Sequence, residues 1–141
     1  MKPKSALRNL AACAALGFTL TLTATAATVT KSATGTDLAD GASWGGSAPT
    51  AADTATWATT SLGAGLTLGS DASWQGIAVS GATSAIDISG GGALTLGTGG
   101  LNLATSTVDL SLANPVSLGG NQPWKAAGGR TISVSGAIGG T

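Results

Sequence analysis

The sequence predicts an all-β protein: a right-handed parallel β-helix, meaning a short solenoid of about three coils with an N-terminal cap. Two observations predict this fold. From Leu66 onward the chain carries short apolar-x-apolar doublets separated by Gly, Ser, Thr, Asn and Ala, and each doublet is typical of a strand with one buried face. The doublets recur every seven or eight residues, so three of them span the 22 to 24 residues of a three-sided coil.

Stacked coils bury inward residues in columns, and this spacing predicts three of them. The columns are Leu66, Ile86, Val108 and Ile132; Trp74, Leu94, Val116 and Ile138; and Ile77, Leu101 and Trp124. The handedness of crossovers between parallel strands predicts a right-handed coil. An antiparallel β-sandwich is the alternative, because it also has short strands with frequent turns. The near-constant spacing and the scarcity of Asn-Gly or Asp-Gly hairpin turns favour the solenoid.

Residues 1–26 are expected to be a signal peptide. Three basic residues precede an apolar stretch at 10–22, which is too short to span a bilayer. The small residues Ala24-Thr25-Ala26 follow as a cleavage site, so the mature chain would begin near Ala27. Cys13 ends a lipoprotein-like Leu-Ala-Ala-Cys box, but too little apolar sequence precedes it, and we expect it to leave with the leader.

The mature composition argues against several classes of function. Lys31, Lys125 and Arg130 remain against six aspartates, and this acidic balance disfavours nucleic-acid binding. The chain has no histidine, glutamate or tyrosine, and its one cysteine lies in the leader. Ser-His-Asp and Cys-His catalytic sets and the usual zinc sets are therefore excluded. We expect that the protein is not an enzyme and that it binds no metal or cofactor. We also expect it to contact a membrane only while it is exported.

Residues 27–41 are expected to be a short linker, and 42–65 the cap with the first strand. Trp44 and Trp57 bracket a Gly/Pro loop, and large aromatic side chains there would cover the open end of the first coil. Stacking of Trp44 on a carbohydrate is the alternative. We expect Asp53 to bond backbone N–H groups of its own turn, since calcium would need several oxygen ligands and no second carboxylate is near.

The remaining residues, 66–141, would form the coils, and they contain one suggestive pair of carboxylates. Asp87 and Asp109 are 22 residues apart, so the predicted register stacks them on adjacent coils about 4.8 Å apart. Both lie between inward residues and would face outward. Together with Trp44 they are weak candidates for a binding site, with no clear basic partner in Lys125 or Arg130.

Several segments between 42 and 141 resemble one family. They are Trp44-Gly45-Gly46-Ser47-Ala48-Pro49, Ala52-Asp53-Thr54-Ala55-Thr56-Trp57, Leu66-Thr67-Leu68-Gly69-Ser70, and Val116 to Trp124 closing on Ile132 to Ile138. This pattern resembles the N-terminal region of bacterial proteins with autotransporter-associated β-strand repeats. The resemblance implies a right-handed β-helix passenger, secreted or displayed on the surface of a Gram-negative-type bacterium. It supplies no catalytic residues.

These observations support two hypotheses. The first is a structural or adhesin-like β-helical segment, truncated at Thr141 and leading a longer autotransporter-type protein, with further β-helical repeats or cell-surface glycans as partners. The second is a carbohydrate-binding or carbohydrate-processing β-helix surface protein, which would use the tryptophans and the Asp87/Asp109 pair.

Overall fold

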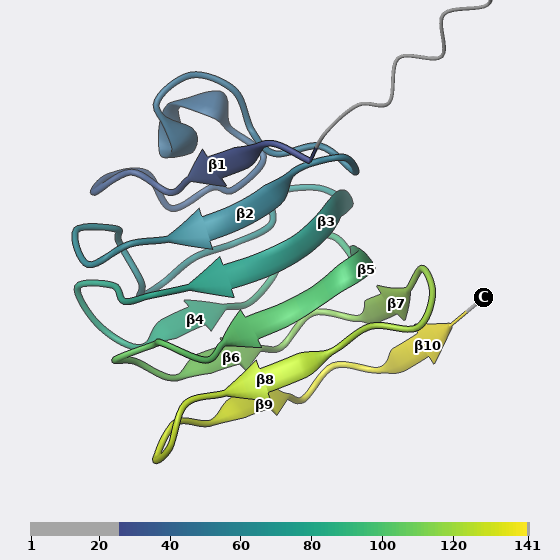
Figure 1. The fold of residues 1–141 in the computed structure, drawn as a ribbon. Helices are drawn as coiled ribbons and strands as arrows, with labels where there is room; N and C mark the ends of the chain where they lie inside the picture. Colours follow the sequence, from purple (N-terminus) through teal and green to yellow (C-terminus); the bar gives the residue numbers. More distant parts are fainter. Residues whose placement is uncertain (1–25, 141) are drawn as a thin grey trace, which may run out of the picture.

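The computed structural model of the protein describes residues 26–140, so all but the last residue of the expected signal peptide lies outside it. The chain winds into a parallel β-solenoid of about five turns (Figure 1). Its elements are β1 (Thr28–Thr30), the 3-10 helix η1 (Gly41–Trp44), β2 (Thr54–Trp57), β3 (Ala72–Val79), β4 (Ile86–Ile88), β5 (Leu94–Leu103), β6 (Leu110–Leu112), β7 (Val116–Leu118), β8 (Trp124–Ala126), β9 (Ile132–Val134) and β10 (Ile138–Gly140). The β-helix prediction is confirmed, but the expected number of coils, about three, was too low.

Every strand pair in the described residues is parallel, which excludes the antiparallel sandwich. One sheet runs β1-β2-β3-β5-β7-β10, with β8 also paired to β5, and a second sheet runs β4-β6-β9. The long strands β3 and β5 each bend from one side of the coil to the next, so the two sheets form three sides. Successive turns descend from β1 to β10 and wind right-handed in Figure 1.

The three sides correspond to the three expected columns, but three residues were expected in the wrong register: Trp74, Leu66 and Val108. The column of Ile77, Leu101 and Trp124 is confirmed, as is the run from Leu94 through Val116 to Ile138. Trp74, however, pairs with Leu96, and Leu94 pairs with Ala72. On the third side Leu66 pairs with Ile88, and Ile86 pairs with Leu110, which then pairs with Ile132.

Val108 was therefore placed wrongly in the third column, and the cause is an irregular corner. Ala72 pairs with Leu94 at a spacing of 22 residues, whereas Gly76 pairs with Gly100 at 24. Two extra residues enter at the corner between Leu96 and Gly100, where the register shifts. Every later residue of that coil is displaced by two positions. Val108 consequently lies just before β6, half-buried against the core.

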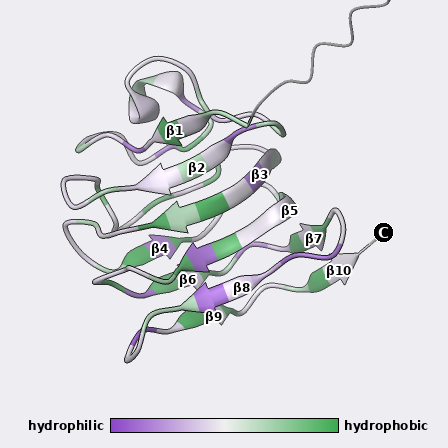
Figure 2. Cartoon of the chain, in the orientation of Figure 1, coloured by the Kyte–Doolittle hydropathy of each residue, from purple (hydrophilic) through white to green (hydrophobic). Residues whose placement is uncertain are grey.

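The segment 27–41 is part of the first coil and not a linker. Thr28–Thr30 pairs with β2, and Leu38 is buried in the core. Alternation of small and polar residues was too weak to reveal this strand. Inside the coils a single core contains the inward residues of successive turns, and hydrophobic and hydrophilic segments alternate along the strands (Figure 2). Burial of these apolar rows is the main stabilising contribution to a solenoid.

Candidate functional site

Three tryptophans pack together beneath the first coil. The ring centroids of Trp44 and Trp57 are 5.3 Å apart, and Trp44 lies 5.8 Å from Trp74, both in edge-to-face geometry. The indole Nε1 of Trp44 donates to the carbonyl of Leu38 at 2.9 Å, so its polar atom is satisfied. Trp44 is only 6% exposed. It is a packing residue, as expected for the cap, and offers no free ring face for a sugar.

The cap itself is the turn around η1, which lies beyond β1 at the start of the solenoid (Figure 1). Asp40 caps η1 by accepting a hydrogen bond from the Ala42 N–H at 3.0 Å. Gly45 ends the helix in the left-handed conformation. The helix places Ser43 and Trp44 against the core, so the apolar interior of the first coil is covered.

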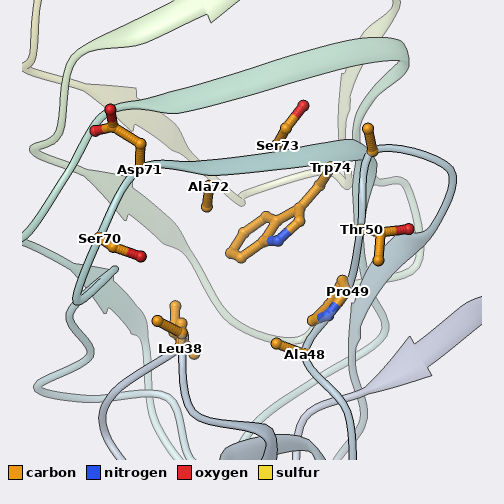
Figure 3. Close-up of a pocket in the computed structure, with 11 residues that line it drawn as sticks. Leu38, Ala48, Pro49, Thr50, Ser70, Asp71, Ala72, Ser73 and Trp74 are labelled. Carbon is orange, nitrogen blue, oxygen red and sulfur yellow. The ribbon is translucent and has the colours of Figure 1, made fainter.

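A cavity of about 320 Å³ lies beside this cap (Figure 3). The indole of Trp74 enters it from β3, and Leu38, Ala48 and Pro49 face it from the first coil. Asp71 is the one ionisable side chain in its lining, and its Oδ1 already accepts from the Ala93 N–H at 2.8 Å. The cavity is therefore a mainly apolar notch without a pair of groups for acid–base chemistry.

The expected Asp87/Asp109 ladder does not form, and that prediction was wrong. Asp87 pairs with Ser111, because the two extra residues at the preceding corner displace Asp109. The carboxylate of Asp109 accepts from the Thr131 N–H at 2.9 Å and lies 3.9 Å from the guanidinium of Arg130. Arg130 is thus the basic partner that sequence reasoning missed, although a half-exposed pair of this kind contributes little stability.

Asp71 and Asp109 share a structural role that the sequence did not suggest. Each precedes a strand by one position, and each carboxylate accepts from a backbone N–H 22 residues later, on the next coil. These contacts fix neighbouring coils at a corner. The two carboxylates therefore have a structural role, because each holds a backbone N–H group of the next coil.

Asp53 and Lys31 are ionisable side chains of the first coil whose pKa values depart from the ordinary ones. The carboxylate of Asp53 accepts from the N–H and the hydroxyl of Thr50, at 2.8 and 2.6 Å, and these bonds lower its pKa. The expected turn-capping role of Asp53 is confirmed. Lys31 is 2% exposed, and its ammonium donates to the carbonyls of Ser32 and Thr34 at 3.1 and 2.7 Å. Burial lowers the pKa of Lys31.

The last coil carries the second hollow, an open groove of about 430 Å³ that we call the terminal groove. It is lined by Leu118, Gly120, Asn121, Gln122, Trp124 and Ile138. Trp124 is 38% and Ile138 is 52% exposed, and they are the exposed large hydrophobic residues of the described chain. Sequence reasoning placed both in core columns, which is where their backbones lie, but no later coil covers their side chains.

Within residues 26–140 no group of three or more His, Cys, Asp or Glu side chains could hold a metal ion. The same range contains no helix with the length and hydrophobicity needed to cross a membrane.

The fold places the protein in the class of parallel β-solenoids. In the described residues the interior of its first coil is covered, and large apolar side chains of its last coil are exposed. Comparison with known proteins does not narrow this class, because no family model, curated protein or solved structure matches the chain. The similarity to autotransporter-associated repeat proteins therefore remains a prediction from the residues.

Proposed function

We propose that this chain is a non-enzymatic structural segment of an exported surface protein, in which it forms the leading coils of a longer β-helical passenger of autotransporter type. The observation that supports this proposal is the difference between the two ends of the solenoid. The interior of the first coil is covered by η1 and the tryptophan cluster, whereas Trp124 and Ile138 of the last coil are exposed in the described residues. A segment that begins a solenoid needs a cap at its start and an edge on which later coils can stack.

The described side chains fit a scaffold role. Asp53, Asp71 and Asp109 bond backbone N–H groups, and Trp44 packs inside the cap. The sides of the coils expose short polar residues between buried aliphatic ones, as in the exposed–buried alternation of β4. Such a rod spaces other parts of a protein away from the cell surface.

Export is tested by following the N-terminus of the protein in a Gram-negative host. We expect the exported product to begin near Ala27, because Ala24-Thr25-Ala26 supplies the small residues that a signal peptidase requires. Mass spectrometry of the periplasmic and external fractions measures this start. Ala26→Lys is the matched control, and it should leave uncleaved precursor. Retention of the parent chain in the cytoplasm with residues 1–26 attached would contradict the proposal.

A carbohydrate-binding function is the second candidate, and one observation favours it. Trp124 is 38% exposed and lines the terminal groove together with Asn121, and a groove lined by an exposed aromatic residue and an amide residue suits a sugar. A glycan array separates the two proposals. Selective binding that disappears in Trp124→Ala and persists in Trp44→Phe would support the second candidate, and a flat array from folded protein would support the first.

A further inference from the structure

The cavity beside the cap has room for a small organic molecule. Its volume of about 320 Å³ lies between the first coil and the start of β3 (Figure 3). Protein interiors are close-packed and contain few voids larger than a water molecule. A dry apolar cavity of about 150 Å³ already accommodates benzene, and ligand pockets of proteins begin at about 300 Å³. The size of this cavity is therefore that of a small ligand site.

The walls of the cavity are fixed by hydrogen bonds within the fold. The N–H of Leu38 donates to the carbonyl of Thr67 at 2.8 Å. Thr50 is held by the carboxylate of Asp53, which accepts from its N–H and its hydroxyl. Trp74 lies in β3 and is paired with β5. A ligand would therefore enter a preformed site, and preformed walls lower the entropic cost of binding.

The indole N–H of Trp74 is a buried hydrogen-bond donor without an acceptor. The indoles of Trp44 and Trp57 donate to the carbonyls of Leu38 and Leu62 at 2.9 and 3.2 Å. Trp74 is only 1% exposed, but its Nε1 donates to no atom of residues 26–140. Figure 3 shows this nitrogen on the edge of the ring that faces the cavity. A buried donor without a partner is destabilising, and an acceptor placed in the cavity would remove this cost.

The other groups that line the cavity limit the chemistry of its occupant. Most of the wall is apolar, and Asp71 is the one charged side chain among the lining residues. Figure 3 shows its carboxylate directed away from the indole of Trp74. An anion would find no basic partner in this lining. An ammonium group would bring N–H donors to an indole that is itself a donor. A neutral molecule with an acceptor oxygen on an apolar body has neither disadvantage.

We propose that this cavity binds a small neutral ketone or alcohol, whose oxygen accepts a hydrogen bond from the indole N–H of Trp74. The apolar body of the ligand would lie against Leu38, Ala48 and Pro49 and supply most of the affinity. Trp74 would orient the ligand and select molecules that carry an oxygen. The site goes beyond the proposed function, because it requires only the fold of the first coils.

The test titrates the ¹⁵N-labelled full chain with cyclohexanone and follows the indole N–H resonances by nuclear magnetic resonance. The resonance of Trp74 is identified by its loss in Trp74→Phe. We expect it to move downfield and to saturate, because a new hydrogen bond forms at this nitrogen. The resonances of Trp44 and Trp57 should move much less, since their N–H groups are already bonded. Cyclohexane is the matched probe without an oxygen, and at equal concentration it should cause no downfield shift.

Two variants distinguish the hydrogen bond from the space in the cavity. Trp74→Phe keeps an aromatic ring without the N–H and should weaken binding of cyclohexanone roughly fivefold, as followed through the backbone amides of Ala48 and Ala72. Ala48→Leu fills the cavity but keeps the indole, so cyclohexanone should no longer move the Trp74 resonance. Ala104→Leu makes the same change at an exposed alanine outside the lining, and it should bind like the parent chain. Circular dichroism measures whether each variant is folded, and Ala48→Leu provides the test if Trp74→Phe does not fold.

Three results would overturn the proposal. The first is a Trp74 resonance that cyclohexanone leaves unmoved into the millimolar range, which would mean that the cavity holds only solvent. The second is an equal response to cyclohexanone and cyclohexane, which would mean that Trp74 does not recognise an oxygen. The third is a response that persists in Ala48→Leu, which would place the ligand elsewhere. Neither export nor further coils enter these measurements, so their outcome is independent of the proposed function.

Discussion

At the scale of single residues, the tryptophan cluster is the feature on which the first coil most depends. Trp57 is fully buried, lies 5.3 Å from Trp44 between ring centroids, and donates from Nε1 to the Leu62 carbonyl at 3.2 Å. Its side chain thus joins the cap to the second turn. Removal of an aromatic side chain from such a site leaves a cavity that the short flanking strands cannot fill.

We expect Trp57→Ala to lower the free energy of unfolding by about 3–5 kcal/mol. Urea titration followed by far-UV circular dichroism measures the change. Trp124→Ala removes the same side chain from an exposed site and should cost much less. Equal losses in the two variants would show that the cluster at the cap contributes no special stability.

Asp53 should make the free energy of unfolding depend on pH in the acidic range. Its hydrogen bonds from Thr50 lower its pKa in the folded state below the ordinary value of 3.8. A carboxylate with a lowered folded pKa stabilises the fold above its unfolded pKa, and this contribution is lost as the pH falls through the folded value. The stability difference between the parent and Asp53→Asn should therefore be greatest near neutral pH and shrink below pH 3.8. Asp87→Asn, at an exposed carboxylate without a hydrogen bond from the described side chains, is the control in the same urea series.

Lys31 should act at the alkaline end of the pH range. Burial lowers its pKa in the fold below the ordinary value of 10.5, so the unfolded chain binds more protons between these two values. Stability should therefore rise with pH through that window, in which the buried ammonium loses its charge. Lys31→Met should remove this rise, as measured by thermal unfolding between pH 8 and pH 11. An identical alkaline slope in both proteins would contradict the assignment to Lys31.

At the scale of elements, the corners decide the register. Gly91 has φ of 80°, and a Cβ placed on it would collide with the backbone nitrogen of Gly69 on the preceding coil. Gly129 has a similar φ of 73° but open space around it. Both glycines adopt a positive φ, but only Gly91 lies against the preceding coil. Substitutions at the two positions therefore distinguish the effect of the backbone conformation from the effect of the close contact between coils.

We expect Gly91→Ala to lower the urea midpoint clearly more than Gly129→Ala does. Gly129→Ala should cost about 1 kcal/mol, because alanine tolerates a positive φ poorly. Gly91→Ala adds the collision with Gly69, which only a shift of one coil can relieve. Similar midpoints for the two variants would mean that coils do not approach closely at this corner.

The sequence predicted much at this scale, since doublet spacing reports the length of a coil directly. It placed Leu94, Val116 and Ile138 in one column and Ile77, Leu101 and Trp124 in another, as observed. It misplaced Val108 because average spacing cannot locate two extra residues within a glycine-rich corner. The Asp87/Asp109 hypothesis depended on that column and failed with it. β1 was missed because its inward position holds a single Val between threonines.

At the scale of the whole molecule, the two ends of the solenoid differ. The interior of the first coil is covered by η1 and Trp44, while Trp124 and Ile138 remain exposed at the last coil. The cover of the first coil by Trp44 was predicted from the sequence, whereas the exposure of Trp124 was not, because Trp124 was placed in a core column and its residue type gives no sign that its side chain stays uncovered. Their burial depends on whether another segment folds over them.

Hydrogen exchange of residues 27–141, followed by mass spectrometry, tests the central claim of a capped start and an open end most directly. Backbone amides in strands that are paired on both sides exchange their hydrogens only when the whole fold opens. Amides in an edge coil also exchange through local opening of that coil. We expect amides of β3 and β5 to exchange most slowly, those of β2 beneath the cap to follow closely, and those of β8, β9 and β10 to exchange roughly a hundredfold faster than β5. Protection of β8 to β10 equal to that of β5 in a monomer would contradict the claim, because it would mean that the last coil is closed.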